Sequence, residues 1–297
     1  MRPVSLLLAV LVAAARAQDP SLPAGPHAVE VRGGIDYWGE PLGREIPLVK
    51  GRDGAEQPRY RISVDAYLPQ GASRPLPMVL LIHGGGLGEG RPEAMALPAR
   101  WLASHGYAAL TPGYTLGQGL APATIDMRQC IRYLRLHAAE LGLDPERFGA
   151  LGYSAGGWIA SMLAVLDDGA VRTELVKDSR GVKTKQQVAY DGGPLLGKVS
   201  ARLQAVVLSS GNQLGKVADA FDRADPPILA YAGEKEAGRA GLLATPEAVA
   251  AAGFPYESWG IAGGGHCPKL TLRFAVDGRD TLLADHVRGF LDRHLKP

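Results

Sequence analysis

A serine flanked by glycines lies near the middle of the chain. The stretch from Gly149 to Gly157 reads Gly-Ala-Leu-Gly-Tyr-Ser-Ala-Gly-Gly, so Ser154 has a glycine two residues before it and two after it. An apolar run precedes it, and helix-compatible residues follow at 155–166. A sharp turn from strand to helix exposes a serine hydroxyl at the end of a sheet, where it can attack a carbonyl. The pattern predicts Ser154 as a nucleophile.

A serine hydroxyl needs a base to take its proton before it becomes a good nucleophile. Chains with this turn use a serine nucleophile, a histidine base and a carboxylic acid that orients the histidine. These follow one another along the sequence in the order serine, acid, histidine. His266 and His286 lie far enough downstream. His266 follows three glycines after an expected strand, whereas His286 falls inside an expected helix. His266 is therefore the predicted base.

The acid should come from the turn after the strand expected at 227–232. That turn reads Gly-Glu-Lys-Glu and offers Glu234 and Glu236. A carboxylate there would hold the imidazole in the correct tautomer and stabilise the imidazolium. Either glutamate could serve. The prediction favours Glu236 and leaves Glu234 open.

Three glycines after His83 indicate a site for the negative charge that develops on the ester oxygen. They end an apolar run at 78–82, which is typical of a central strand covered on both faces. Glycine lets backbone N–H groups approach a ligand closely. Together with the N–H of Ala155, one or two of the N–H groups of Gly84–Gly86 could form an oxyanion hole.

Strands alternating with helices predict an α/β fold with one mostly parallel sheet covered on both faces. Strands are expected at 62–69, 78–82, 107–111, 148–153, 205–208, 227–232 and 256–261. Helices are expected at 93–104, 124–141, 155–166, 245–252 and 280–295.

Three segments do not follow this alternation of strands and helices. Residues 1–17 combine a positive start, a short apolar run and a small-x-small site, as in a cleaved secretory signal. Residues 18–36 are expected to form a flexible lead-in to a catalytic domain at 37–297. Within that domain, the long connection 167–202 is expected to be either a small cap over Ser154 or a solvated surface excursion.

Charge and cysteine content narrow the possible partners. Loss of Arg2 and Arg16 with the signal would bring the formal net charge from +2 to zero, which gives no electrostatic footprint for nucleic acid or acidic membranes. Cys130 and Cys267 could pair or remain free thiols. No His/Cys/Asp cluster has metal-ligand spacing. The predicted chemistry requires no cofactor, and the oligomeric state stays open.

These residues resemble the HGGG-type carboxylesterases of the α/β-hydrolase family, especially bacterial acetylxylan, feruloyl and related carbohydrate esterases. The likeness runs from about Ile62 to the C-terminus. Its motifs are Asp65–Pro69, His83–Gly86, Asp126, Leu143–Pro145, Gly152–Gly157, Ala205–Val207, Pro226–Pro227 and Gly263–His266.

This resemblance implies an α/β-hydrolase fold with Ser154 as nucleophile and His266 as base. It also implies that the oxyanion donors are Gly84, Gly85 and Ala155. Glu236 falls where the family usually has an aspartate, three residues beyond a His-Gly pair, and Ala232 replaces that histidine. Leu87 stands where many relatives carry tryptophan.

The leading hypothesis is a secreted or periplasmic serine esterase that removes short acyl groups, of acetyl or feruloyl type, through an acyl-enzyme, with glycan esters as possible substrates. Tyr114, Tyr153 and Trp158 are candidates for aromatic contacts to a sugar or for packing. Two alternatives remain. One is a prolyl-oligopeptidase-like serine peptidase, and the other is a binding protein whose triad has decayed.

Overall fold

The structure, a computed structural model, describes residues 22–38, 62–177, 181–222, 224–243, 253 and 255–296. The expected signal segment 1–17 and the expected helix at 245–252 lie outside these residues. No helix of the described chain is both long enough and apolar enough to cross a bilayer.

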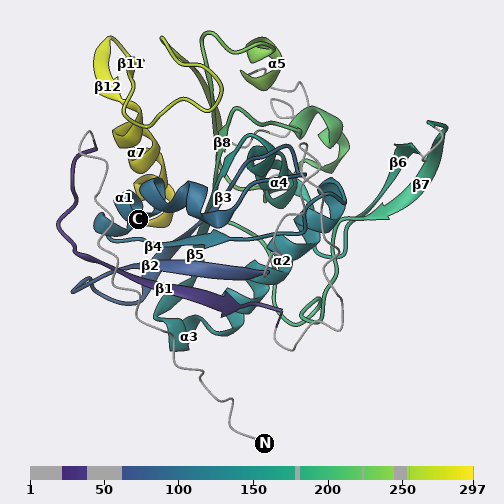
Figure 1. The fold of residues 1–297 in the computed structure, drawn as a ribbon, viewed down its shortest axis with the longest axis horizontal. Coiled ribbons are helices and arrows are strands. Elements are labelled where there is room, and N and C mark those ends of the chain that lie inside the picture. Colours follow the sequence, from purple (N-terminus) through teal and green to yellow (C-terminus); the bar gives the residue numbers. More distant parts are fainter. Residues whose placement is uncertain are drawn as a thin grey trace, which may run out of the picture.

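An eight-stranded sheet forms the centre of the protein, in the order β1-β2-β4-β3-β5-β8-β9-β10 (Figure 1). β1 and β2 run antiparallel to their neighbours, whereas every pairing from β4 to β10 is parallel. The strands are β1 Val29–Asp36, β2 Ser63–Pro69, β3 Leu76–Ile82, β4 Ala108–Pro112, β5 Leu143–Tyr153, β8 Ala205–Ser209, β9 Ile228–Gly233 and β10 Tyr256–Ile261. The prediction of a mostly parallel sheet is confirmed.

Helices cover both faces of this sheet. They are α1 Ala96–Ser104, α2 Leu120–Leu136, α3 Ala138–Leu141, α4 Ala155–Val165, α5 Arg239–Leu243 and α7 Leu283–Leu295, with a short hairpin of β11 Arg273–Val276 and β12 Arg279–Leu282 before α7. α1 and α7 contribute to one hydrophobic core, and α2 and α4 to the other.

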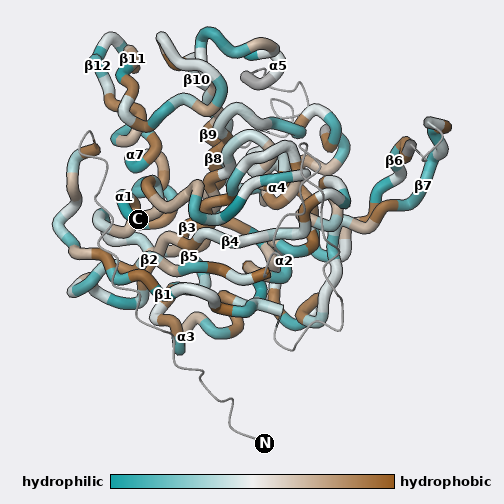
Figure 2. The backbone as a smooth tube through the Cα atoms, in the orientation of Figure 1, coloured by the Kyte–Doolittle hydropathy of each residue, from teal (hydrophilic) through white to brown (hydrophobic). Residues whose placement is uncertain are grey.

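β3 shows how the sequence builds these two cores. All seven of its residues are buried. Met78 and Leu80 pack into the core with α2 and α4, whereas Val79 and Leu81 pack into the core with α1 and α7. Successive side chains of a strand point to opposite faces, so a continuous apolar run fits a strand between two helical layers. Figure 2 shows hydrophobic segments gathered along the central strands.

Several boundaries differ from expectation. The expected lead-in 18–36 contains strand β1, whose Val29 and Val31 pack against the core beneath it. Backbone pairing with β2 explains this, because the strand needs only a partly apolar face at the sheet edge. The expected helix 124–141 begins earlier, after Gly119 with φ +92°, and is divided into α2 and α3 at His137.

The expected cap segment 167–202 contains a two-stranded hairpin, β6 Val171–Lys177 paired with β7 Lys183–Ala189. Figure 1 shows it extending away from the sheet at the right of the view. Val171 and Leu175 are exposed on one of its faces. Of the two alternatives for this segment, the hairpin has the form of a surface excursion.

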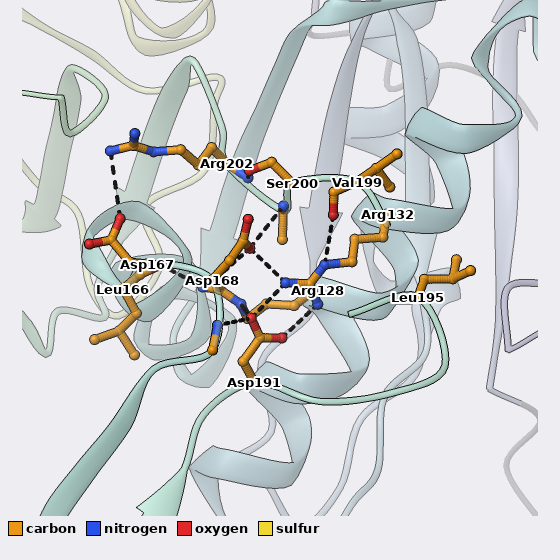
Figure 3. A network of polar contacts seen from close by, with 12 residues as sticks. Arg128, Arg132, Leu166, Asp167, Asp168, Asp191, Leu195, Val199, Ser200 and Arg202 are labelled. Atoms are coloured by element: carbon orange, nitrogen blue, oxygen red, sulfur yellow. Dashed lines mark hydrogen bonds and ion pairs between the residues drawn. The ribbon is translucent and has the colours of Figure 1, made fainter. Parts of the chain in front are cut away.

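A buried charge cluster holds the base of this hairpin against α2 (Figure 3). Both carboxylate oxygens of Asp191 accept hydrogen bonds from Arg132 at 2.6 Å, and Arg128 Nε lies 3.0 Å from the same carboxylate. Asp168 Oδ1 accepts from Arg132 at 2.6 Å and from Arg128 at 3.0 Å. Asp168 and Asp191 flank the hairpin, so the two arginines fix both of its ends to one helix.

Candidate active site

Ser154 lies at the junction between β5 and α4, in a backbone conformation with φ 54° and ψ −117°. This region is sparsely populated for a residue with a side chain and persists only where neighbours hold it. The flanking glycines allow it. A Cβ on Gly152 would lie 2.2 Å from the carbonyl oxygen of Gly156, and one on Gly156 would lie 2.1 Å from that of Ile82. Only glycine permits this close crossing of strand, helix and β3.

The structure brings Ser154, His266 and Glu236 into one hydrogen-bonded chain. His266 Nε2 lies 2.8 Å from Ser154 Oγ, and His266 Nδ1 lies 2.5 Å from Glu236 Oε1. A carboxylate can only accept, so Nδ1 carries the proton and Nε2 is left to accept the serine hydroxyl. The three groups follow β5, β10 and β9, whose carboxyl ends share one edge of the sheet.

The two glutamates of the acid turn have different neighbours. The Glu236 side chain is 6% exposed and faces His266. Glu234 is exposed, and its Oε2 accepts a hydrogen bond from the N–H of Gly263 at 3.3 Å. A Cβ on Gly233 would lie 2.1 Å from the carbonyl oxygen of Gly265. Glycine at 233 therefore lets the acid turn, residues 233–236, pack on the histidine loop, residues 262–266. Of the two, Glu236 is the one that contacts His266.

The predicted oxyanion donors lie beside Ser154. A Cβ on Gly84 would lie 3.0 Å from the Cβ of Ser154. Gly85 has φ +119°, where a Cβ would lie 2.0 Å from the carbonyl oxygen of Glu89. In the described part of the chain, no group accepts a hydrogen bond from the N–H of Gly84, Gly85 or Ala155. These donors are therefore available to a ligand.

His83 packs against the glycine loop, residues 84–86. It is fully buried, its Nδ1 lies 2.7 Å from the carbonyl oxygen of Gly84, and its ring stacks on Tyr114 at 4.3 Å. The Tyr114 hydroxyl donates to the carbonyl of His83 at 2.9 Å. Burial lowers the pKa of His83, which favours the neutral ring. Tyr114 is thus a packing residue and not a surface for a sugar.

A cavity of about 560 Å³ opens beside the candidate triad. It is lined by Ser154, Trp158, Ser210, Asn212, Lys235, Glu236, Ala237, Gly238, Gly241 and His266. Trp158 is the one residue of the three aromatic candidates that reaches it. No described residue of 167–202 lines it. The cavity combines an aromatic ring with polar groups, which suits an amphipathic ligand.

Ser210 is a residue of this site that the sequence analysis missed. It follows β8, the strand between β5 and β9, and its hydroxyl contacts Glu236 Oε2 at 2.5 Å. The signal was present, because Ser209-Ser210-Gly211 is a polar run at the end of an apolar strand at the same sheet edge. Sequence alone gave no reason to connect it with Glu236.

Both cysteines are unpaired thiols. Cys130 is buried in α2, and burial raises its pKa well above the ordinary value. Cys267 follows His266 directly, yet burial raises its pKa to about 11. A thiol with so high a pKa is protonated at neutral pH and is a weak nucleophile. Ser154 therefore has no thiolate competitor at this position.

The sheet order, the serine turn and the order of the three groups along the chain define the α/β-hydrolase fold. Residues 64–192 match a family model described as BD-FAE, and this range contains both glycine motifs. A search of curated proteins gives no match. The predicted fold class is confirmed.

Solved structures with low sequence identity share this fold. A truncated form of a carbohydrate esterase from gut microbiota is 17% identical with a TM-score of 0.66, over 93% of this chain and 99% of that one. Esterase 2 from Thermogutta terrifontis, phosphoramylated by tabun, is 20% identical with a TM-score of 0.56, over 87% and 96%. A bifunctional GH43-CE protein from Bacteroides eggerthii is 20% identical with a TM-score of 0.61, over 88% of this chain and 35% of that one. The predicted serine hydrolase of carboxylic esters agrees with these neighbours.

Proposed function

We propose that this chain is an exported serine carboxylesterase that removes short acyl groups, of acetyl or feruloyl type, from glycan esters. The observation that carries the proposal is the hydrogen-bonded chain from Ser154 through His266 to Glu236. The alternative hypothesis, a binding protein whose triad has decayed, had its only support in the unusual acid turn. That support is weakened, since Glu236 approaches the imidazole within hydrogen-bonding distance.

Acylation follows from this geometry. Ser154 Oγ attacks the ester carbonyl while His266 Nε2 takes its proton. Glu236 stabilises the imidazolium that forms. The carbonyl oxygen becomes negatively charged and accepts hydrogen bonds from the free N–H groups beside Ser154. When the intermediate collapses, the C–O bond to the alcohol breaks, and the imidazolium donates its proton to the leaving oxygen.

Deacylation repeats these steps with water. His266 removes a proton from a water molecule as its oxygen attacks the acyl carbonyl. The same N–H groups stabilise the second oxyanion. The bond to Ser154 Oγ then breaks, His266 returns the proton to the serine, and the carboxylic acid leaves. Every proton moves through His266, so the reaction needs no cofactor.

Trp158 supports a carbohydrate as the alcohol part of the substrate. Its ring lines the cavity beside Ser154 and His266, and it is only partly buried. An aromatic face in such a position can pack on the apolar face of a sugar ring. The carbohydrate esterases among the structural neighbours support the same substrate class.

The proposal predicts a clear preference in a series of p-nitrophenyl esters from acetate to decanoate. For a site of acetyl type we expect hydrolysis of acetate and a steep fall in kcat/KM with chain length, whereas a site of feruloyl type should also accept longer acyl groups. Release of p-nitrophenolate measures the rate. Absence of hydrolysis at every chain length, or faster cleavage of a matching amide, would overturn the proposal and favour the binding protein or the peptidase.

Trp158→Ala tests the carbohydrate part separately. We expect kcat/KM for an acetylated xylo-oligosaccharide to fall about fivefold, since one aromatic contact contributes on the order of 1 kcal/mol. The value for p-nitrophenyl acetate, which lacks the sugar, should change much less. Acetate release measures the first and p-nitrophenolate the second. An equal loss on both substrates would contradict a sugar contact.

A further inference from the structure

Ser210 links the two loops that carry the acid and the base. Its side chain is almost fully buried, with 4% of the residue exposed. Its Oγ lies 2.5 Å from Glu236 Oε2 and 2.8 Å from the backbone nitrogen of Cys267, the residue after His266. One hydroxyl therefore touches both loops.

The direction of these hydrogen bonds follows from the number of protons. A serine hydroxyl has one proton to donate and lone pairs to accept. The backbone N–H of Cys267 can only donate, so Ser210 Oγ accepts there. Its own proton is then directed at Glu236 Oε2. The second carboxylate oxygen accepts from His266. The N–H of Gly233 is a longer donor to Oε2 at 3.4 Å, so Ser210 is the nearer of the two donors to that oxygen.

Backbone geometry supports a functional reason for this bridge. Ser210 has φ +53° and Cys267 has φ +52°, both in the left-handed region that side-chain-bearing residues rarely adopt. Such conformations cluster at functional sites, where the surroundings hold them. Here the Ser210 backbone N–H donates to the carbonyl of Tyr231 at 2.8 Å, which ties the strained residue to β9.

We propose that Ser210 is a positioning residue for the reaction: its hydroxyl fixes the carboxylate of Glu236 and, through it, the orientation of His266. In this proposal Ser210 neither transfers a proton nor forms a bond to the substrate. The inference rests on the proposed function for its effect on turnover, but the hydrogen-bonded arrangement can be measured without turnover.

Two variants separate the hydroxyl from the backbone. Ser210→Ala removes Oγ, and Ser210→Gly removes Oγ while suiting the positive φ. We expect both to lower kcat about 10- to 100-fold, as for loss of a hydrogen bond to a charged group, with KM nearly unchanged. Full activity of Ser210→Gly would overturn the proposal, because the residue would then matter only for its backbone.

A double-mutant cycle tests whether Ser210 acts through Glu236. Glu236→Gln keeps the volume of the side chain but removes the carboxylate. In that background, adding Ser210→Ala should lower kcat further by less than about twofold, since no carboxylate remains to be held. In Glu234→Gln, the matched control, it should cost as much as in wild type. Full additivity with Glu236→Gln would overturn the proposal.

Proton NMR gives a readout that does not depend on activity. The proton on His266 Nδ1 should resonate far downfield in wild type because its hydrogen bond to Glu236 is short. Ser210→Gly should shift or broaden this signal. If wild type hydrolyses no ester and the signal still responds, the proposed function fails while this inference stands. An unchanged signal in Ser210→Gly would overturn the inference.

Discussion

Ser154→Ala is expected to lower kcat for p-nitrophenyl acetate by about 10⁵- to 10⁶-fold, as for loss of the nucleophile in other serine hydrolases. In the proposed mechanism Oγ forms the acyl-enzyme, and the nearby thiol of Cys267 is a poor substitute because burial raises its pKa to about 11. The residual rate comes from the oxyanion donors and substrate binding alone. Release of p-nitrophenolate by purified protein measures the effect.

Ser73→Ala is the matched control, since Ser73 is exposed. It should keep full activity. A fluorophosphonate probe should label wild type and Ser73→Ala but leave Ser154→Ala unlabelled. If Ser154→Ala kept more than about 1% of wild-type kcat, the acyl-enzyme mechanism would be wrong.

Asp191→Asn is expected to lower the free energy of unfolding by about 3–5 kcal/mol. The side chain of Asp191 is fully buried, and so is that of Arg132, which it binds with both oxygens. It also accepts from the backbone N–H groups of Gly169 and Gly192 at 2.8 Å each. Asparagine removes one of the two carboxylates that pair with the two buried guanidinium groups, and the other, Asp168, is partly exposed. Urea unfolding followed by circular dichroism measures the loss.

Asp219→Asn provides the contrast. Asp219 pairs with Arg172, but its side chain is 76% exposed, so the change should cost no more than about 1 kcal/mol. Equal losses for the two variants would mean that burial does not set the strength of the Asp191 cluster.

The Asp191 cluster should also contribute to acid sensitivity. Burial alone would raise the pKa of Asp191, but its hydrogen bonds and the charges of both arginines hold that pKa below the ordinary value of 3.8. Its contribution is then complete above that value and is lost as pH falls through the lower, folded-state pKa. Wild type should thus lose its advantage over Asp191→Asn in this acid range. A constant difference down to the lowest pH would contradict this assignment.

Features that depend on residues close together in the sequence, such as the serine turn and the central strand β3, could be predicted from the sequence. Ser154 and its glycines form a motif because the crossing of β5, α4 and β3 forbids side chains at two of those positions. The apolar run of β3 predicts a central strand because both of its faces are covered. His266 could be singled out as the candidate base because a glycine-rich loop follows a late strand, and the structure places it in contact with Ser154 and Glu236.

Features that depend on the meeting of distant loops could not be predicted. The prediction favours Glu236 but leaves Glu234 open, because both lie in the same turn and only the folded structure shows that Glu236 faces His266. Ser210 is separated from Cys267 by 57 residues, and no local pattern links them. The hairpin β6–β7 was missed because β7 is largely polar and exposed, so its hydrophobicity carries no strand signal.

The way the hairpin joins the rest of the protein has a consequence for engineering. Its two ends meet where the Tyr190 N–H donates to the carbonyl of Ala170 at 2.9 Å, and the arginines of α2 anchor both ends from beneath. Between these anchors, the hairpin contacts the rest of the protein through Arg172, which pairs with Asp219, and through Val188, which packs against the core that contains α2 and α4. We therefore expect that the part of the hairpin beyond Arg172 and Val188 can be shortened to a tight turn or exchanged for a carbohydrate-binding module. Ser154, His266 and Glu236 should keep their geometry in such a variant.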